Sequence, residues 1–350
     1  MAVLVGIIVS GTSLSLAWQS ADLSQIAIFP PDNYWHWDIS QYQIHPNSVN
    51  FVASVGLTSA LHPDFGTVYN GAPMGIPYHL VGKNQPKIPI NFTDYGDESD
   101  PGPYPIPLNG LVEGNDSLSG DRHILAIDSD GKMLYELFVA IPKVDHWDAA
   151  CGAKFDLASN AMRPVTWTSA DAAGLPILPG LVRYDEIARG EIDHAIRMTV
   201  VTTQRKYLWP AQHYASSNTS VNVPPMGLRF RLKASVNIST LPRAAKIVAM
   251  ALKRYGMIVA DNGGNWYISG APDDRMPDDE LNALKTLKGS DFEAILSVNP
   301  DGTPIRPTPI LPRFTTKSPF VTKGGWFNGL GRMVPEPAKR IPMRKTLFVK

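Results

Sequence analysis

Alternating apolar and polar residues predict a β-hairpin over residues 121–140. Two β-rich runs, DRHILAID and MLYELFVA, flank a turn with the sequence SDGK. If Ile127 pairs near Leu134, then His123 and Glu136 share one sheet face, because side chains alternate along a strand. The pattern therefore predicts an imidazole and a carboxylate as near neighbours.

The same alternation continues along the chain and is interrupted by one helical periodicity. Residues 192–199 alternate so that His194 lies on the more apolar side, and the runs MGLRFRLKASVNI and MIVADNGGNWYISG are also typical of strands. Between these two runs, apolar residues recur at helical spacing. This helix is predicted to begin after Ser239 or Thr240 as its cap and to end at Gly256.

Short strands dominate this pattern, so the chain is predicted to be mainly β. The 31 prolines and 28 glycines interrupt helices and mark turns along the whole length. We expect a β-sandwich, either a jelly roll or a concanavalin-like fold, with one or two packed helices, the second over residues 278–287. At 350 residues and 44% hydrophobic, one β-rich domain over residues 23–298 is preferred to two smaller ones.

The two ends of the chain differ from this middle part. Residues 2–17 form an apolar run followed by polar residues, which is typical of a secretory signal peptide and predicts that residues 1–22 direct export. The usual basic start is missing, and a short N-terminal strand or an uncleaved anchor would show the same pattern. Residues 299–350 are rich in proline and basic residues, which predicts either an extended arm, through which the protein could self-assemble, or a poorly ordered extension.

Composition narrows the compartment and the partners. Thirty-two basic residues balance thirty-two acidic ones, so no global field attracts a nucleic acid. No second apolar run is long enough to span a bilayer, and the lone Cys151 leaves stability to core packing. We expect a secreted, extracellular protein that binds no nucleic acid and has no integral membrane span beyond the N-terminal signal.

Four Asn-X-Ser/Thr sites lie in polar, turn-like stretches where a glycan would meet solvent. They would be glycosylated if the host is eukaryotic, and they are Asn91, Asn115, Asn218 and Asn237.

A proline-rich acidic segment offers the one candidate for a metal. Its clustered oxygens are typical of a calcium loop, and they belong to Asp94, Asp97, Glu98 and Asp100. The glycine and terminal glutamate of an EF-hand are absent, so a solvated acidic loop is favoured and no cofactor is expected.

Stronger catalytic motifs are missing from the sequence. There is no phosphate-binding glycine loop, no HExxH, no GxSxG elbow and no paired CxxC. Chemistry, if there is any, would be carried by carboxylates and histidines. The candidates are Glu136, Asp121, His123, Asp171, His194 and His213.

Each histidine also has a structural interpretation. His123 and Glu136 would form either an acid/base pair in a wet groove or a satisfied structural pair. His194 would be either catalytic or buried and bonded to a carbonyl. His213 follows Trp209 in WPAQH, an arrangement that suits sugar binding or a packed corner.

Several phrases resemble a group of uncharacterised secreted bacterial proteins from organisms that process polysaccharides. They include LHPDFG, SGDRH, WTSADAAGLPILPGLVRYDE, GEIDHAIR, PPMGLRFRLKAS and YGMIVADNGGNWYISG, and they span roughly residues 29–296. The resemblance implies export and a compact β-rich fold, and it brings no assigned activity. Related sequences often read WPARH where this chain has Gln212, which removes a cation at that position.

Two functions are consistent with the sequence. The first is an extracellular carbohydrate-active enzyme, a glycoside hydrolase with Glu136 as acid and Asp121 or Asp171 as its partner, or else a polysaccharide lyase with a histidine or tyrosine base. The second is a non-catalytic glycan-binding or extracellular structural protein. Its contact surface would be formed by exposed aromatic residues, namely Trp35, Trp37, Trp209 and Trp266.

Overall fold

The computed structural model describes residues 18–114, 119–130 and 132–307, together with the backbone of short strands between residues 321 and 334. The chain divides into two units, Met1–Pro307 and Thr308–Lys350. The second unit carries a three-stranded antiparallel sheet made of β16 (Val321–Thr322), β17 (Gly325–Phe327) and β18 (Met333–Val334). The N-terminal apolar run lies outside the described residues. Of the predicted C-terminal arm, the described part up to residue 307 belongs to the first unit.

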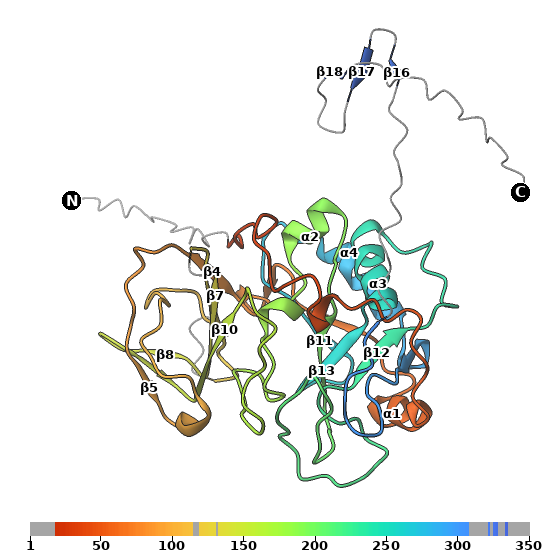
Figure 1. Ribbon diagram of the computed structural model, residues 1–350, viewed down its shortest axis with the longest axis horizontal. Helices are drawn as coiled ribbons and strands as arrows, with labels where there is room; N and C mark the ends of the chain where they lie inside the picture. The colour runs from red at the N-terminus through yellow and green to blue at the C-terminus, as the bar shows by residue number, and fades with distance from the viewer. Residues whose placement is uncertain are drawn as a thin grey trace, which may run out of the picture. The chain divides into compact units, whose positions relative to one another are not determined.

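The larger sheet of the first unit has six strands in the order β1-β14-β11-β13-β12-β15, and Figure 1 labels β11, β12 and β13 among them. Their bounds are β1 (His62–Asp64), β14 (Tyr267–Ser269), β11 (Ile196–Val200), β13 (Met257–Asn262), β12 (Arg229–Leu232) and β15 (Phe292–Ala294). Every residue of β11 and β12 is buried, because both strands are covered on both faces. An arginine within β11 or β12 must therefore find its partners inside the protein.

A second, four-stranded sheet has the order β10-β7-β6-β4. Its strands are β4 (Tyr78–Val81), β6 (Ile124–Asp128), β7 (Met133–Phe138) and β10 (Cys151–Asp156). Strands β6 and β7 form the predicted hairpin, and Ile127 lies opposite Leu134 as expected. The predicted register is confirmed.

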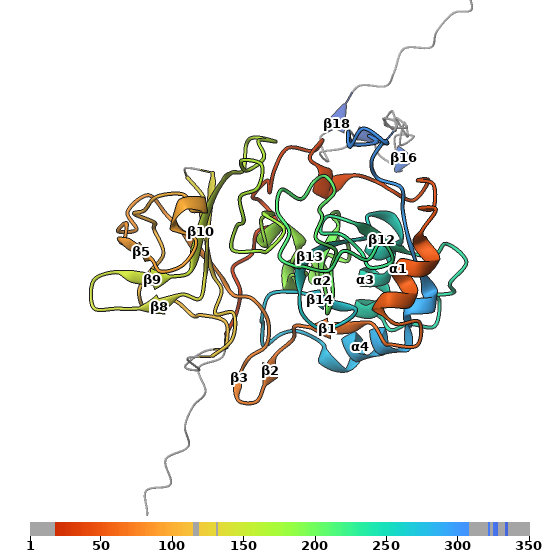
Figure 2. The same cartoon turned by 90° about the horizontal axis from the view of Figure 1, so that it is seen from below.

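Two smaller sheets complete the β structure. One, of order β5-β9-β8, lies beside the four-stranded sheet in both views (Figures 1 and 2). Its strands are β5 (Ile90–Phe92), β9 (Trp147–Ala149) and β8 (Ile141–Pro142). The other is a hairpin of β2 (Val68–Tyr69) and β3 (Ala72–Pro73).

Helices are few and short. The α-helices are α1 (Ser48–Val55), α2 (Tyr184–Arg189), α3 (Arg243–Arg254) and α4 (Asp278–Asn282). Single 3-10 turns occur at Tyr34–His36, Gly96–Glu98, Leu178–Gly180, Ala283–Thr286 and Gly289–Asp291. In the described part of the chain no helix is long and apolar enough to cross a membrane.

Helix α3 is the predicted central helix, and its end follows from backbone geometry. Gly256 has a φ of +70°, and a Cβ there would lie 2.3 Å from the carbonyl oxygen of Phe230. Only glycine fits this position, so the helix ends where the sequence predicts. The start differs from the prediction, because Pro242 and not Ser239 or Thr240 occupies the cap position. The predicted second helix is present as α4 and the 3-10 turn after it.

The prediction of a mainly β protein with few helices is confirmed, and the sheets are mixed. Four strand pairs run parallel, namely β1–β14, β11–β13, β4–β6 and β5–β9. A jelly roll consists of antiparallel strands. The parallel pairs matter for function because they align residues from distant parts of the chain.

Candidate functional site

Three neighbouring strands of the six-stranded sheet bring Asp64, Ser269 and Arg197 together. Asp64 is aligned with Ser269 in the parallel β1–β14 pair, and the Oγ atom of Ser269 accepts a hydrogen bond from Arg197 Nη1 at 2.7 Å. Asp64 reaches solvent, yet burial raises its pKa and outweighs the opposing charge of His62, while the charges of Glu113 and Arg197 have smaller effects that raise and lower it respectively. A carboxylate that reaches solvent but is partly desolvated by its surroundings is expected to have such a raised pKa. No hydrogen bond to its carboxyl group is found within the described residues.

A β-bulge turns a second carboxylate to the same side of the sheet. The register of β11 and β13 shifts between Met198 and Thr199, so that Thr199 lies opposite Asp261 and not Ala260. Because Thr199 and Arg197 share one face of β11, Asp261 then faces Arg197, and its Oδ2 lies 3.3 Å from Arg197 Nη2. Burial and the charge of Asp171 raise the pKa of Asp261 to about 7, against the lowering effect of Arg197.

A buried ion pair fixes Arg197. Its Nε and Nη2 atoms donate to the two carboxylate oxygens of Asp171, each at 2.8 Å, and both side chains are almost fully buried. Asp171 is itself held by Ser169, whose hydroxyl accepts the Asp171 amide at 2.9 Å. This bidentate geometry leaves Arg197 little freedom, so it presents a fixed positive charge to Asp64 and Asp261.

A second ion pair, between His123 and Glu113, joins the group from the other sheet. His123 Nδ1 lies 2.5 Å from Glu113 Oε2, and His123 Nε2 lies 3.0 Å from the carbonyl oxygen of Ala170. Burial opposes the charge on His123, but the charge of Glu113 and its hydrogen bond outweigh burial and raise the pKa of His123 to about 9. Burial likewise opposes the charge of Glu113, and His123 still holds the pKa of Glu113 below its ordinary value. The loop of residues 168–174 links both pairs, since Ala170 contacts one and Asp171 the other.

We call Asp64, Glu113, His123, Asp171, Arg197 and Asp261 the carboxylate cluster. Its members act on one another electrostatically: Arg197 lowers the pKa values of Asp64 and Glu113, and His123 lowers that of Asp261. The Glu113 and Asp261 side chains remain 29% and 18% exposed, so both reach solvent. The cluster therefore combines an ionised carboxylate, Glu113, with a carboxyl group that titrates near neutral pH, Asp261. This separation of pKa values is typical of an acid and a base that work together.

Stacked rings lie on the same sheet face as Asp64. His62 and Tyr267 are aligned in the β1–β14 pair, and their ring centroids are 4.0 Å apart at an interplanar angle of 9°. His62 is two residues before Asp64, and side chains two apart in a strand share a face. The carboxylate cluster thus has a flat aromatic neighbour.

Glu136 does not face a groove, contrary to the sequence expectation. It is 0% exposed, and its carboxylate accepts the backbone amides of Ile177 at 2.9 Å and Leu178 at 3.0 Å. Burial raises its pKa to about 7, with the two amides acting in the opposite direction. The charge of His123 lowers the pKa of Glu136, which fits the predicted proximity of the two residues, but Glu136 ties the sheet to the turn that begins at Leu178. The physical basis for an acid/base role at Glu136 is therefore missing.

Of the other predicted catalytic residues, Asp171 lies in the carboxylate cluster, while Asp121, His194 and His213 lie outside it. Asp121 is exposed, and Asp171 is fully buried against Arg197. His194 is 2% exposed and lies 2.8 Å from the carbonyl oxygen of Ala195, with its second ring nitrogen 2.9 Å from Glu186. This geometry fits the structural alternative for that histidine.

His213 is partly buried, and its Nδ1 atom lies 2.7 Å from the carbonyl oxygen of Ala172. Its ring stacks on Tyr214, with centroids 5.9 Å apart. Of the predicted catalytic residues, only His123 and Asp171 belong to the carboxylate cluster.

The expected surface of exposed tryptophans is wrong for three of its four members. Trp35 and Trp266 are 0% exposed and Trp37 is 7% exposed. Trp266 Nε1 donates to the carbonyl oxygen of Gly56, and Trp209, which is partly exposed, stacks on Trp37 at 4.8 Å. Burial of a tryptophan ring removes a large apolar area from water, and in this protein three of the four rings are packed in the core.

Three of the four carboxylates of the acidic loop make protein contacts, and one of these, Asp94, accepts from the hydroxyl of its neighbour Thr93 at 2.8 Å. Asp100 accepts from the Lys154 amide and from Arg163, and Glu98 accepts from the Thr168 amide, whereas Asp94 and Asp97 are exposed. Across the described ranges, no group of three or more acidic, histidine or cysteine side chains is arranged to hold a metal.

Of the four Asn-X-Ser/Thr sites, Asn91 and Asn237 are exposed and Asn218 is partly exposed. The amide group of Asn91 also donates to Asp148 at 2.8 Å. Asn115 lies outside the described residues.

Sequence reasoning missed Asp64, Glu113, Arg197 and Asp261. Three of them stand inside quoted phrases: Asp64 in LHPDFG, Arg197 in GEIDHAIR and Asp261 in YGMIVADNGGNWYISG. Arg197 also carries a signal of its own, since it is flanked by Ile196 and Met198 in a β-rich run, and a charge that such a strand buries requires a buried partner. Comparison of the chain with protein-family models, with curated proteins and with solved structures found no match.

Proposed function

We propose that this chain is an extracellular glycoside hydrolase whose reacting groups are Asp261 and Glu113. The observation that carries the proposal is that two carboxyl groups that reach solvent are held by charged partners, Glu113 by His123 and Asp261 by Arg197, and that their pKa values diverge, about 7 for Asp261 and below the ordinary value for Glu113. Glycosidic bond cleavage needs one carboxyl group that gives a proton and one carboxylate that acts as base or nucleophile.

Each residue of the cluster has a role in this proposal. Protonated Asp261 donates its proton to the glycosidic oxygen as the bond to the leaving group breaks, and ionised Glu113 activates a water or attacks the sugar carbon. His123 positions Glu113 and keeps it ionised. Arg197 positions Asp261, and Asp171 positions Arg197.

The surroundings support a sugar as the substrate. The stacked His62 and Tyr267 rings offer a flat surface against which the apolar C–H groups of a sugar pack. Asp64, on the same face, is a carboxylate suited to accept sugar hydroxyl groups. An export signal, as predicted for residues 1–22, would bring the enzyme to polysaccharides outside the cell.

A glycan library assayed with four proteins tests the proposal: wild type, Asp261→Asn, Glu113→Gln and Asp97→Asn. Asp97 is an exposed acidic residue outside the cluster, which makes it the matched control. We expect Asp261→Asn to lower kcat by at least about a hundredfold with binding retained, because general acid catalysis contributes about that much. Asp97→Asn should match the wild type.

Two outcomes would contradict the proposal. One is wild-type turnover on a glycan that Asp261→Asn leaves unchanged. The other is the absence of turnover on any glycan in the library, which would favour the alternative of a glycan-binding or structural protein.

A further inference from the structure

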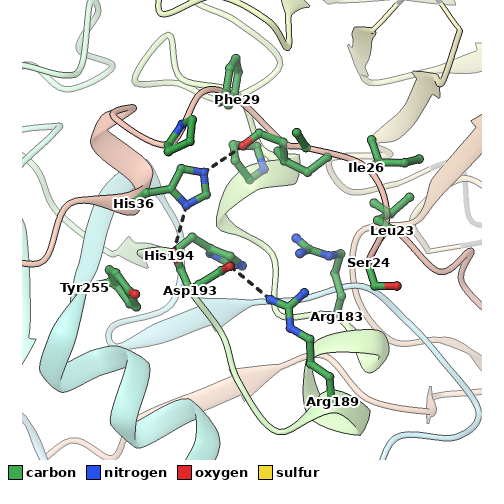
Figure 3. A pocket seen from close by; sticks show the side chains of 14 residues that line it. Leu23, Ser24, Ile26, Phe29, His36, Arg183, Arg189, Asp193, His194 and Tyr255 are labelled. Atoms are coloured by element: carbon green, nitrogen blue, oxygen red, sulfur yellow. Dashed lines mark hydrogen bonds and ion pairs between the residues drawn. The ribbon is translucent and has the colours of Figure 1, made fainter. Parts of the chain in front are cut away.

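A pocket separate from the carboxylate cluster lies between the N-terminal segment and α2 (Figure 3). Its volume is about 360 Å³, within the size range of small-molecule sites. Leu23, Ile26 and Phe29 form an apolar wall, and Arg183 and Arg189 lie across the pocket from Phe29 (Figure 3).

Arg183 is buried with hydrogen-bond donors unused. It is 5% exposed, and its Nη2 atom donates to Glu186 Oε1 at 2.5 Å. Its Nε atom lies 3.5 Å from Asp185 Oδ1, an ion pair without a hydrogen bond, and neither Nε nor Nη1 has a hydrogen-bond acceptor. A buried charged donor without an acceptor is costly, so something that accepts hydrogen bonds is expected beside it.

Arg189 adds a second guanidinium group to the same pocket. Its side chain is 34% exposed, and its Nη2 atom donates to Asp193 at 3.2 Å while Nε donates to the carbonyl oxygen of Glu191 at 3.0 Å. Figure 3 shows the Arg183 and Arg189 side chains side by side. Two guanidinium groups in one pocket are suited to a planar oxyanion.

The acidic residues around the pocket are already engaged. Glu186 Oε1 accepts from Arg183 and faces His194 Nε2 at 2.9 Å, and Glu186 Oε2 accepts the Arg183 amide. Asp185 accepts the Leu23 amide at 3.1 Å, and Asp193 accepts from Arg189. Asp193 keeps 55% of its side chain exposed to solvent, whereas Arg183 Nε and Nη1 are buried without an acceptor, which favours a ligand that accepts hydrogen bonds.

We infer that this pocket binds a small organic acid. Its carboxylate pairs with Arg183 and Arg189, and its apolar body packs on Leu23, Ile26 and Phe29. The ligand must be amphiphilic, because the pocket is lined both by arginines and by aliphatic and aromatic groups.

Isothermal titration of the full chain with hexanoate tests the inference, with hexanamide as the neutral analogue and inorganic phosphate as the purely polar anion. We expect hexanoate to bind with one-to-one stoichiometry and hexanamide not to bind. Arg189→Gln should weaken hexanoate binding by about tenfold or more, since it removes a charged donor. Ile26→Asp, which places a negative charge in the apolar wall, should weaken it as well, and Arg205→Gln, at an exposed arginine outside the pocket, should not.

These variants avoid the deeply buried Arg183, whose replacement endangers folding. The inference is overturned if hexanoate fails to bind, which would mean that water alone serves the Arg183 donors. It is also overturned if Arg189→Gln and Arg205→Gln bind equally well, or if phosphate binds as tightly as hexanoate. None of these results bears on turnover by the carboxylate cluster.

Discussion

Replacing Glu113 by glutamine tests whether one ion pair keeps a buried histidine charged. His123 is 1% exposed, and the charge of Glu113 overcomes burial to raise the pKa of His123 to about 9 from 6.5. At about 1.36 kcal/mol per pKa unit, the raised pKa corresponds to about 3 kcal/mol of folding free energy.

The sign of the pH dependence follows from the direction of the shift. The pKa of His123 is higher in the folded protein than in the unfolded chain, so its stabilisation is fully present below pH 6.5 and is lost as the pH rises through about 9. The Glu113→Gln substitution removes the negative charge that raises the pKa of His123, so that burial then lowers this pKa. The difference in unfolding free energy between wild type and variant should therefore be largest near about pH 6 and shrink toward about pH 9.5.

Urea unfolding monitored by tryptophan fluorescence across this pH range measures the difference, and an NMR titration of the imidazole measures the pKa directly. Asp145→Asn is the matched control, because Asp145 pairs with His146 at 2.8 Å on the exposed surface. Solvent screens such a pair, so this variant should follow the wild type at every pH. A wild-type His123 that titrates at or below its ordinary value, or a stability gap that does not vary with pH, would refute the reasoning.

Three further predictions concern the cluster and the fold. Glycan turnover should decline as the pH rises through about 7, because Asp261 loses its proton there, and Asp261→Asn should abolish this limb of the pH–rate profile. Arg197→Gln should lower the unfolding free energy by about 3 to 5 kcal/mol in urea denaturation, because it leaves Asp171 as a buried unpaired charge; a double variant with Asp171→Asn that is no more stable would count against this. Gly256→Ala should cost more than about 1 kcal/mol by the same assay, since its Cβ would meet the Phe230 carbonyl oxygen, and an unchanged midpoint would argue against that contact.

Local patterns in the sequence determined much of the secondary structure. The register of Ile127 with Leu134, the helix that ends at Gly256 and the short helix from Asp278 were all predictable, because each depends on residues close together in the chain. Alternation also predicted correctly that His123 and Glu136 share a face. It did not predict α1, where Val49, Val52 and Val55 are β-branched residues within a helix.

Only the tertiary structure decided which faces of the strands are exposed to solvent. Alternation gives the side of a strand on which Glu136 lies, but the amides of Ile177 and Leu178, some forty residues away, cover that side. Likewise, parallel strand pairing aligns Asp64 with Ser269, which binds Arg197, and a β-bulge turns Asp261 toward Arg197; no local pattern encodes either feature. The sequence by itself determined the β-rich fold and the direction of individual side chains, whereas long-range packing determined which of the charged groups are buried as structural pairs and which are gathered into a candidate site.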